Sequence, residues 1–296
     1  MSGTVGIIGL GIMGSIFARH LLAAGVQVVG CDIDPARRVE LAAAGGSVMG
    51  SPRDVAQAAP VVITLLPSEL ALDEVVAGAG GLAGAGAFVL VECSTMSLQA
   101  KHQAAGRLAG TGADILDCPI SGTGVQAARK ELSFYASGRA EVFARVRDIL
   151  ALVGRDVFYL GEFGNGTKTK LISNLLVAIH NVAAAEAITL ARRAGIDPEA
   201  MLRTVTAGAG SSRMLEVRGP MMIAGSYGTG ESSRLDVFRK DLAVIGAFCT
   251  EVGSVAPVFG LCAQLYQSAI AQGWERLDPG AVCKVIEGMA GLAEDG

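Results

Sequence analysis

The chain has 296 residues, a length that predicts two domains at a usual size of about 150 residues each. Its 24 lysine and arginine residues against 28 aspartate and glutamate residues give a formal net charge of −4, and the absence of a basic block argues against nucleic-acid binding. Hydrophobic residues make up 51% of the chain and charged residues 18%, which excludes the composition of a disordered protein.

Strands and helices are expected to alternate through the first half of the chain. Short apolar runs rich in Val and Ile predict strands, and apolar residues at helical spacing predict helices. The expected strands cover residues 5–8, 26–31, 61–66, 88–92, 114–116, 134–136 and 157–160, and the first two helices cover residues 12–24 and 35–44. This alternation is typical of a parallel sheet with helices on both faces.

The pattern changes at residues 161–166, where the sequence GEFGNG forms a glycine-rich joint. A long apolar helix is expected from about residue 167 to residue 193, and almost everything after it is helical. Asp197 and Asp278, each followed by Pro, predict two later helix starts. We therefore expect an α/β domain with a doubly wound parallel sheet over residues 1–162, then an all-α domain over residues 163–296 that includes the long interdomain helix.

The sequence carries no signal for export, metal binding or disulfides. The N-terminal residues lack the basic region and cleavage site of a signal peptide, so we expect a cytoplasmic protein. The apolar stretch 171–191 is interrupted by Asn174, His180, Asn181 and Glu186, which favours a buried helix over a membrane span. Six scattered cysteines without a CxxC pair and three histidines without metal-ligand spacing predict neither a metal site nor a disulfide framework.

The sequence GLGIMG at residues 9–14 matches the GxGxxG pattern and lies between the first expected strand and the first expected helix. In this position Gly9 permits a tight turn, Gly11 lets a pyrophosphate approach the backbone, and Gly14 lets the helix pack closely on the strand. The N–H groups and dipole of the helix then favour phosphates. The motif predicts a dinucleotide-binding domain of the Rossmann type.

Asp32 stands at the end of the second expected strand, where its carboxylate can accept both ribose hydroxyl hydrogens of NAD. A carboxylate there would repel the 2′-phosphate of NADP. Asp32 also fits a helix cap or a loop acid, and Arg37 and Arg38 lie close enough to compete for the ribose. We expect NAD as the cofactor, with NADP as the alternative.

Further motifs follow in order, and with the glycine loop the chain resembles the β-hydroxyacid dehydrogenases, a family that includes 3-hydroxyisobutyrate dehydrogenase and tartronate semialdehyde reductase. The motifs are LLP at residues 65–67, ECST at 92–95, DCPISG at 117–122, GNGTKTK at 164–170 with Asn174, and KDL at 240–242. The resemblance covers essentially the whole length. It implies that the Ser-Gly segment holds the substrate carboxylate, that the helix lysine donates or accepts the proton, and that the helix asparagine orients the substrate.

Carried onto this sequence, the resemblance assigns three groups of site residues. The catalytic residues are Lys170 and Asn174; the substrate-binding residues are Ser121 and Gly122, to which we add Thr123; the cofactor-binding residues are Gly9, Gly11, Ile12, Met13, Gly14, Asp32, Leu66, Pro67, Thr95 and Lys240.

The spacing of the lysines agrees with this assignment. Lys170 and Asn174 are four residues apart and share a helix face, whereas Lys168 lies about 200° around the helix from Lys170. A lysine in the first turns opposes the helix dipole, which favours the neutral amine that an acid or base near neutral pH needs. The alternative interpretation is a solvated lysine at a helix start.

Other site residues also have simpler interpretations. The segment 117–122 is either a turn with free N–H groups that hold a carboxylate or an ordinary connection. Thr95 is either a hydroxyl facing the cofactor or a turn residue. Lys240 with Asp241 forms either the closing side of the cofactor cleft, as the resemblance implies, or an exposed helix pair.

The sequence departs from the family pattern at two positions. The usual Ser-Gly-Gly is Ser121-Gly122-Thr123, followed by Gly124, and the usual Pro after Ser-Thr-x-x is Leu98. A threonine with positive φ would be strained, so either Thr123 has ordinary dihedrals or the turn moves onto Gly124. Thr123 is expected to select a short or extra-oxygenated acid.

We interpret the chain as an oxidoreductase that transfers a hydride reversibly between a nicotinamide cofactor and a small β-hydroxyacid or its semialdehyde, with the active site between the two domains. An imine reductase-like NADP enzyme is one alternative, although such enzymes typically carry another residue at the lysine position. A non-catalytic cofactor-binding regulator is the other. A homodimer or homotetramer is expected, with no nucleic acid and no membrane as partner.

Overall fold

The computed structural model describes residues 3–228 and 233–292. These residues form two compact units that divide after Lys170. The first unit contains the sheets and the start of α8 (Asn165–Arg193); the second contains the rest of α8 and the helices after it. The domain boundary expected at residue 162 remains a prediction.

The larger sheet of the first unit has six parallel strands in the order β3-β2-β1-β4-β5-β6. They are β1 (Thr4–Ile8), β2 (Gln27–Cys31), β3 (Ser47–Val48), β4 (Val61–Thr64), β5 (Val89–Glu92) and β6 (Asp114–Asp117). The direction of winding reverses between the neighbours β1 and β4, and doubly wound sheets bind ligands at the carboxyl ends of strands at this point. The predicted doubly wound parallel sheet is confirmed.

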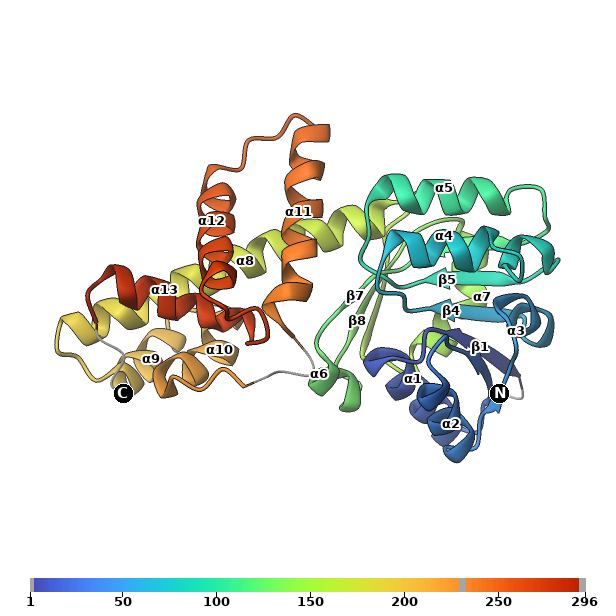
Figure 1. Cartoon of the computed structure of the whole chain (residues 1–296), viewed down its shortest axis with the longest axis horizontal. Helices are drawn as coiled ribbons and strands as arrows, with labels where there is room; N and C mark the ends of the chain where they lie inside the picture. The colour runs from blue at the N-terminus through green and yellow to red at the C-terminus, as the bar shows by residue number, and fades with distance from the viewer. Residues whose placement is uncertain (1–2, 229–232, 293–296) are drawn as a thin grey trace. The chain divides into compact units, whose positions relative to one another are not determined.

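Both faces of this sheet are covered by helices because successive strand residues point to opposite sides. Ile63 and Val91 pack into the core that includes residues of α1, α2 and α7, whereas their neighbours Val62 and Leu90 pack into the core that includes residues of α3, α4 and α5. These helices are α1 (Ile12–Ala23), α2 (Pro35–Ala43), α7 (Ala140–Leu150), α3 (Pro52–Ala58), α4 (Glu69–Ala77) and α5 (Leu98–Leu108). Figure 1 shows α4 and α5 side by side over β4 and β5.

A second, smaller sheet follows in the same unit. It consists of β7 (Ile120–Ser121), β8 (Ser133–Ala136) and β9 (Asp156–Tyr159), with β7 antiparallel and β9 parallel to β8. The short helix α6 (Gly124–Ala128) lies between β7 and β8 in the chain. The apolar runs of β8 and β9 were predictable, but their pairing apart from the larger sheet has no signal in the spacing of the runs.

The described part of the second unit is helical throughout, as expected. After α8 come α9 (Pro198–Thr206), α10 (Arg213–Ala224), α11 (Leu235–Glu251), α12 (Pro257–Ala271), a 3-10 turn (Pro279–Ala281) and α13 (Val282–Met289). Asp197 accepts the backbone N–H groups of Glu199 and Ala200 at 3.2 and 3.1 Å, and Asp278 accepts that of Gly280 at 2.8 Å. Both predicted starts are therefore capped.

The 29-residue helix α8 begins two residues before the expected start and ends at the expected residue. By length and composition alone it could cross a membrane, and 44% of its most apolar 18-residue window is buried within the structure. Core helices of globular proteins meet the same criterion. Ala178, Ala185 and Ile188 of this helix are fully buried in the core of the second unit.

Candidate active site

The glycine loop connects β1 to α1 at the point where the winding of the sheet reverses. Gly9 has φ +89°, and a Cβ on it would lie 2.3 Å from the carbonyl oxygen of Leu65 after β4. A Cβ on Gly14 would lie 1.9 Å from the carbonyl oxygen of Gly9. Gly11 differs from both, because it is exposed and a Cβ on it would meet no described atom within 4 Å. Gly9 and Gly14 thus allow the loop, the strand ends and α1 to pack closely, whereas the space beside Gly11 is open.

The start of α1 fits the phosphates of a dinucleotide. Five helices of the first unit, α2 to α6, have a side chain that caps their first turn: Asp34, Ser51, Ser68, Ser97 and Thr123. Within the described residues, Gly11 at the start of α1 provides no side-chain cap, and neither does Arg139 at the start of α7; only α1 begins with the glycine motif. Its first N–H groups are therefore available to an anion, which is what this motif provides for a pyrophosphate.

Asp32 follows β2 and is bound to the glycine loop. Its Oδ2 accepts the backbone N–H of Leu10 at 2.6 Å, and its Oδ1 accepts that of Asp34 at 2.8 Å. These bonds fix the carboxylate beside the loop, and each oxygen keeps a further lone pair for a ribose hydroxyl. Burial and, to a smaller extent, the charge of Asp32 raise the pKa of the neighbouring Cys31 thiol to about 12, which disfavours its thiolate form.

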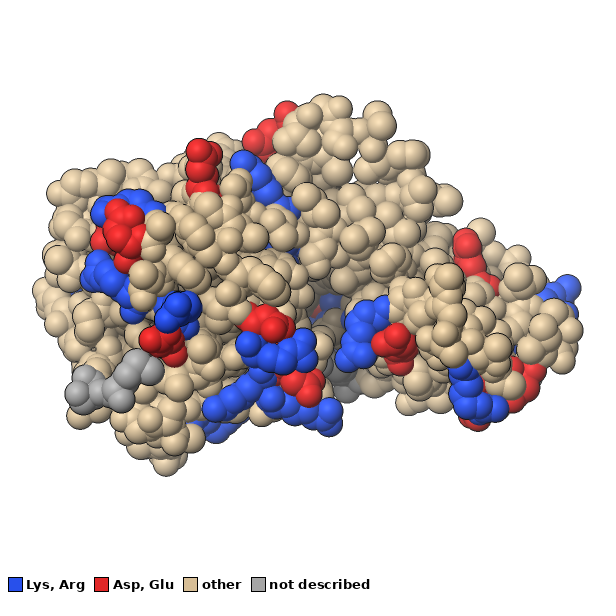
Figure 2. Space-filling view, turned by 180° about the vertical axis from the view of Figure 1, so that it is seen from behind, with Lys and Arg blue, Asp and Glu red and all other residues tan. Residues whose placement is uncertain are grey.

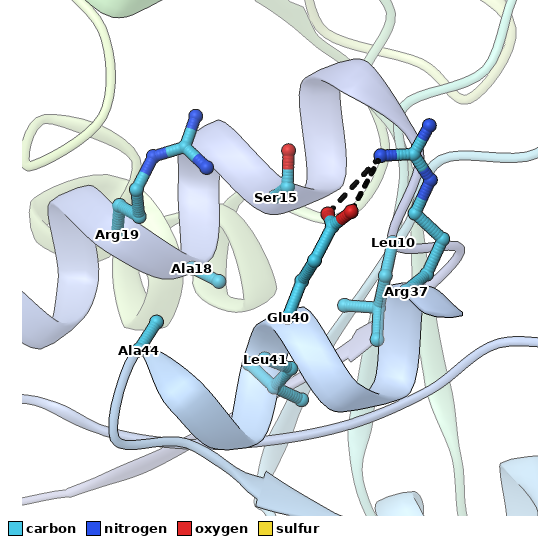
Figure 3. Close-up of a pocket in the computed structure, with 8 residues that line it drawn as sticks. All are labelled: Leu10, Ser15, Ala18, Arg19, Arg37, Glu40, Leu41 and Ala44. Carbon is cyan, nitrogen blue, oxygen red and sulfur yellow. Dashed lines mark hydrogen bonds and ion pairs between the residues drawn. The ribbon is translucent and has the colours of Figure 1, made fainter. Parts of the chain in front are cut away.

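A small hollow lies between α1 and α2 (Figure 3), and it includes Leu10, whose backbone N–H donates to Asp32. It is lined by Leu10, Ser15, Ala18, Arg19, Arg37, Glu40, Leu41 and Ala44. Arg37 Nη1 lies 3.1 Å from Glu40 Oε2, while the guanidinium of Arg19 lies beyond Ser15 on the other side. The positive charge of Arg37 is thus shared with an acid on its own helix. Arg37 was predictable from the sequence as a competitor for the ribose, whereas Glu40 was not.

The ends of β4 and β5 are joined by hydrogen bonds. The backbone N–H of Leu66 donates to Ser94 Oγ at 2.8 Å, and the N–H of Ser94 donates to Glu92 Oε1 at 3.0 Å. Leu66, Pro67 and Thr95 therefore lie at the same edge of the sheet as the glycine loop, next to the point of reversal. Pro67 is exposed, and Leu66 and Thr95 are half-buried.

The segment Ser121–Thr123 makes the turn from β7 into α6. Gly122 has φ +135°, and a Cβ on it would lie 2.5 Å from Leu132 Cδ2, so glycine is required there. Thr123 has φ −100°, which is ordinary, so the first of the two alternatives for this departure holds. Its hydroxyl and the Gln126 side chain form a capping box, in which Thr123 N–H donates to Gln126 Oε1 at 2.9 Å.

Lys170 and Asn174 lie on one face of α8, as the spacing predicted. Both are buried, at 9% and 6% exposure, whereas Lys168 is exposed. Asn174 Nδ2 donates to Asp241 Oδ2 on α11 at 3.1 Å. Lys240 Nζ lies 3.6 Å from Asp241 Oδ1, and its side chain is 37% exposed against 15% for Asp241. Asp241 is thus a partner of Asn174, a contact that the adjacent charges at 240–241 did not reveal.

A buried ionic cluster lies behind the strand ends and was not predicted. Lys101 on α5 is fully buried, with its Nζ in contact with Glu92 Oε2 and 3.0 Å from Asp117 Oδ1. Burial alone would lower the pKa of Lys101, but the charges of Glu92 and Asp117 outweigh it and raise the pKa above the ordinary value, so the ammonium stays charged. The motifs at 92–95 and 117–122 contained both acids, but no pattern pointed to the lysine.

The cysteines and histidines form no further site in the part of the chain that the structure describes. All six cysteines are free, and no group of three or more His, Cys, Asp or Glu side chains is placed to hold a metal ion. Burial raises the pKa of the Cys93 thiol, with a smaller effect from a hydrogen bond with Cys118. The described chemistry therefore centres on the strand ends and on α8.

Residues 4–161 match the NAD-binding domain of 6-phosphogluconate dehydrogenase, and residues 164–286 match the NAD-binding domain of NADP-dependent 3-hydroxyisobutyrate dehydrogenase. L-threonate dehydrogenase of Cupriavidus necator is 35% identical over 98% of this chain and 98% of its own length. The 2-hydroxy-3-oxopropionate reductase of Escherichia coli is 30% identical over 97% of this chain and 98% of its own length. A crystal structure of 3-hydroxyisobutyrate dehydrogenase from Salmonella typhimurium superposes with a TM-score of 0.84 at 32% identity, over 96% of this chain and 99% of that one.

Proposed function

The chain belongs to the β-hydroxyacid dehydrogenases, and from this premise we propose how its own residues divide the reaction. It is an NAD(P)-dependent oxidoreductase of a small hydroxyacid or its semialdehyde. The observation that carries the proposal for the site is the burial of Lys170, one helical turn before Asn174 on α8. Lys170 belongs to the unit that also holds the glycine loop.

The bound nicotinamide cofactor supplies or accepts the hydride. In the reductive direction the Lys170 ammonium donates its proton to the alkoxide that develops on the substrate, and before that it stabilises the negative charge. In the oxidative direction the neutral amine accepts the proton of the alcohol. Asn174, held by Asp241 at 3.1 Å, presents its amide in a fixed orientation to the substrate.

The substrate acid is bound at the turn after β7. Gly122 has a conformation that L residues rarely adopt, and we expect this bend to offer its own N–H and the Ser121 hydroxyl, because the N–H of Thr123 is already bound to Gln126 Oε1. Such groups suit a carboxylate. Thr123 adds a methyl and a hydroxyl beside Ser121, which favours a small, oxygen-rich acid over a branched one. The L-threonate dehydrogenase among the relatives acts on an acid of that kind.

NAD is the preferred cofactor. Asp32 is fixed beside the glycine loop by two backbone N–H groups, and Glu40 in the hollow between α1 and α2 pairs with Arg37. The carboxylate of Asp32 disfavours a 2′-phosphate, and Glu40 partly neutralises Arg37, one of the two arginines that line the hollow. Comparing kcat/KM for the two cofactors tests this, and a clear preference for NADP would show that Arg19, Arg37 and Arg38 govern the ribose site.

A homodimer or homotetramer accounts for the apolar surface of the second unit. Exposed large hydrophobic side chains include Leu190 on α8 at 69%, Leu261 on α12 at 63% and Met289 on α13 at 74%. Apolar side chains in such number favour burial against another subunit.

The cytoplasmic location expected from the sequence also remains a prediction.

The deciding experiment is the absorbance of reduced nicotinamide during turnover of a panel of acids: L-threonate, 3-hydroxyisobutyrate, 2-(hydroxymethyl)glutarate and, in the reductive direction, 2-hydroxy-3-oxopropionate. We expect turnover of at least one hydroxyacid with NAD. Cofactor binding without turnover of any acid would favour the regulator. Turnover of cyclic imines in preference to every acid would favour the imine reductase, against which Lys170 argues.

A further inference from the structure

The first turn of α8, which carries Lys170, is held by one buried carboxylate. Asp117, the last residue of β6, is fully buried, and its Oδ2 accepts the backbone N–H of Thr167 at 2.7 Å. Its Oδ1 accepts the Thr167 hydroxyl, also at 2.7 Å. Ser137 extends the contact, because its Oγ accepts the N–H of Gly166 at 2.9 Å and lies 3.2 Å from Asp117 Oδ2.

The carboxylate is itself fixed from the opposite side. Lys101 Nζ lies 3.0 Å from Asp117 Oδ1 and 3.3 Å from the carbonyl oxygen of Glu92. The ammonium thus joins the carboxyl ends of β5 and β6. The Glu92 carboxylate also accepts the N–H of Ser94, and the Ser94 hydroxyl accepts the N–H of Leu66. A continuous chain of hydrogen bonds and ion pairs, buried from Ser94 onward, therefore runs from the loop after β4 to the start of α8.

The backbone at the start of α8 also has little freedom to move. A Cβ on Gly166 would lie 2.1 Å from the carbonyl oxygen of Tyr135 and 3.1 Å from Asp117 Oδ2. The helix start is seated directly on β8 and on the end of β6. Lys170 follows Thr167 by three residues, so any tilt or fraying of this turn would move its ammonium.

We propose that Asp117 is a positioning residue for the reaction: it binds the first turn of α8 and thereby fixes Lys170 relative to the strand ends that bind the cofactor. The inference rests on the proposed role of Lys170. An apolar cluster of the same volume would stabilise the sheet at least as well as buried charges do. Unlike apolar side chains, the Asp117 carboxylate accepts hydrogen bonds from both the N–H and the hydroxyl of Thr167, and so fixes their direction.

The test removes one bond while keeping the size of the side chain. Thr167→Val deletes the hydroxyl that donates to Asp117, and Thr189→Val makes the same change at a buried position of α8 outside the proposed site. We expect Thr167→Val to lower kcat by about 10- to 100-fold, since a displacement near 1 Å has an effect of this size. The Kd for NADH stays within about twofold, since cofactor binding precedes the step. Thr167→Ser, which keeps the hydroxyl, retains kcat within about threefold.

A kcat for Thr167→Val within about twofold of that of wild type would overturn the inference, as would an equal loss in Thr189→Val. Should Thr167→Val fail to fold, Asp117→Asn keeps the shape and must show the same loss of kcat with unchanged NADH binding.

Amide hydrogen exchange separates this inference from the proposed function. We expect residues 166–170 to exchange faster in Thr167→Val and at the wild-type rate in Thr189→Val, whether or not a hydroxyacid is turned over. If the wild-type protein turned over no hydroxyacid, the proposed function would be contradicted. The exchange rates of residues 166–170 would still show whether Asp117 holds the first turn of α8. Unchanged exchange in Thr167→Val would overturn the positioning role.

Discussion

Lys168 and Lys170 stand two residues apart on α8 in different surroundings. Lys170 is 9% exposed and shares a face with the buried Asn174, whereas Lys168 is exposed, with its Nζ 3.3 Å from Asn165 Oδ1. A step of two residues turns the side chain about 200° around the helix. The two lysines therefore have the same chemistry and different access to the proposed site, which makes one a control for the other.

Lys170→Ala is expected to lower kcat at least about 10²-fold, the lower end for a positioned acid or base. The Kd for NADH should stay within about twofold, because no step of cofactor binding uses this amine. Initial rates at saturating substrate, with NADH fluorescence titration alongside, measure both. Lys168→Ala serves as the control and should keep the wild-type rate. An equal loss in the two variants would contradict the assignment.

Thr123→Gly tests the departure in the acid-binding turn. The ordinary φ of −100° at Thr123 means that glycine relieves no strain there, so the variant loses the methyl and the hydroxyl, and with the hydroxyl the cap of α6. We expect the variant to gain on acids with a bulky C2 substituent relative to small ones by roughly 10- to 200-fold in kcat/KM, the range for one methylene. A series of acids that differ only at C2 measures this. If wild type and variant rank the series identically, Thr123 lies outside the pocket.

At the scale of elements, the glycine loop separates two roles that the sequence motif combines. Gly14 is surrounded by backbone, with Gly9 O 1.9 Å from the position of a Cβ, whereas Gly11 has φ −61° and open space. A methyl group on Gly14 must displace the loop or the helix. A methyl group on Gly11 meets no described atom of the protein, only the volume in which a pyrophosphate would lie.

Gly14→Ala and Gly11→Ala should therefore fail in different ways. Gly14→Ala should lower the free energy of unfolding by about 1–3 kcal/mol through overpacking. Gly11→Ala should change it by less than about 1 kcal/mol, the size of an N-cap effect. The Kd for NADH should rise in Gly11→Ala by about 10-fold, which corresponds to about 1.4 kcal/mol. Urea unfolding and NADH titration measure the two quantities, and an unchanged Kd in Gly11→Ala would place the pyrophosphate elsewhere.

Elements with a strong local signal were predictable from the sequence, and those defined by pairing were not. β4 and β5 are fully buried and apolar except for their last residues, Thr64 and Glu92, so their composition alone identified them. β3 and β7 are each only two residues long, and both residues of β3 are exposed, so neither strand gives a periodic pattern. Lys101 was missed because a lysine in a polar helix gives no sign of burial; its burial depends on two acids from other elements, Glu92 and Asp117.

On the scale of the whole molecule, charge is spread thinly. The formal net charge is −4, and on the face shown in Figure 2 positive and negative side chains lie interspersed among uncharged ones. Each compact unit also has a buried ion network of its own. The first contains Lys101, and in the second Arg218 lies 2.6 Å from Asp278 Oδ1 and 3.2 Å from Asn181 Oδ1.

Removing the cation from each network should destabilise the unit that contains it. Lys101→Met leaves Glu92 and Asp117 buried without a positive charge, and such a loss lowers the free energy of unfolding by about 3–5 kcal/mol. Arg218→Met leaves Asp278, which is 14% exposed, in a similar position in the second unit. Peptide-resolved hydrogen exchange measures both, and Lys101→Met should act on core peptides before residue 170 and Arg218→Met on those after it.

The contribution of the Lys101 ammonium to the stability of the wild type should also be constant between about pH 7 and 9. The folded pKa of Lys101 is raised above the ordinary value of 10.5, because the charges of Glu92 and Asp117 outweigh burial. A raised folded pKa means that the ammonium contributes fully below the unfolded pKa and loses its contribution only as pH rises through the folded one. Urea unfolding at several pH values measures this. A difference between wild type and Lys101→Met below about 1 kcal/mol, or one that falls steadily across this range, would mean that the ammonium does not compensate the two buried carboxylates.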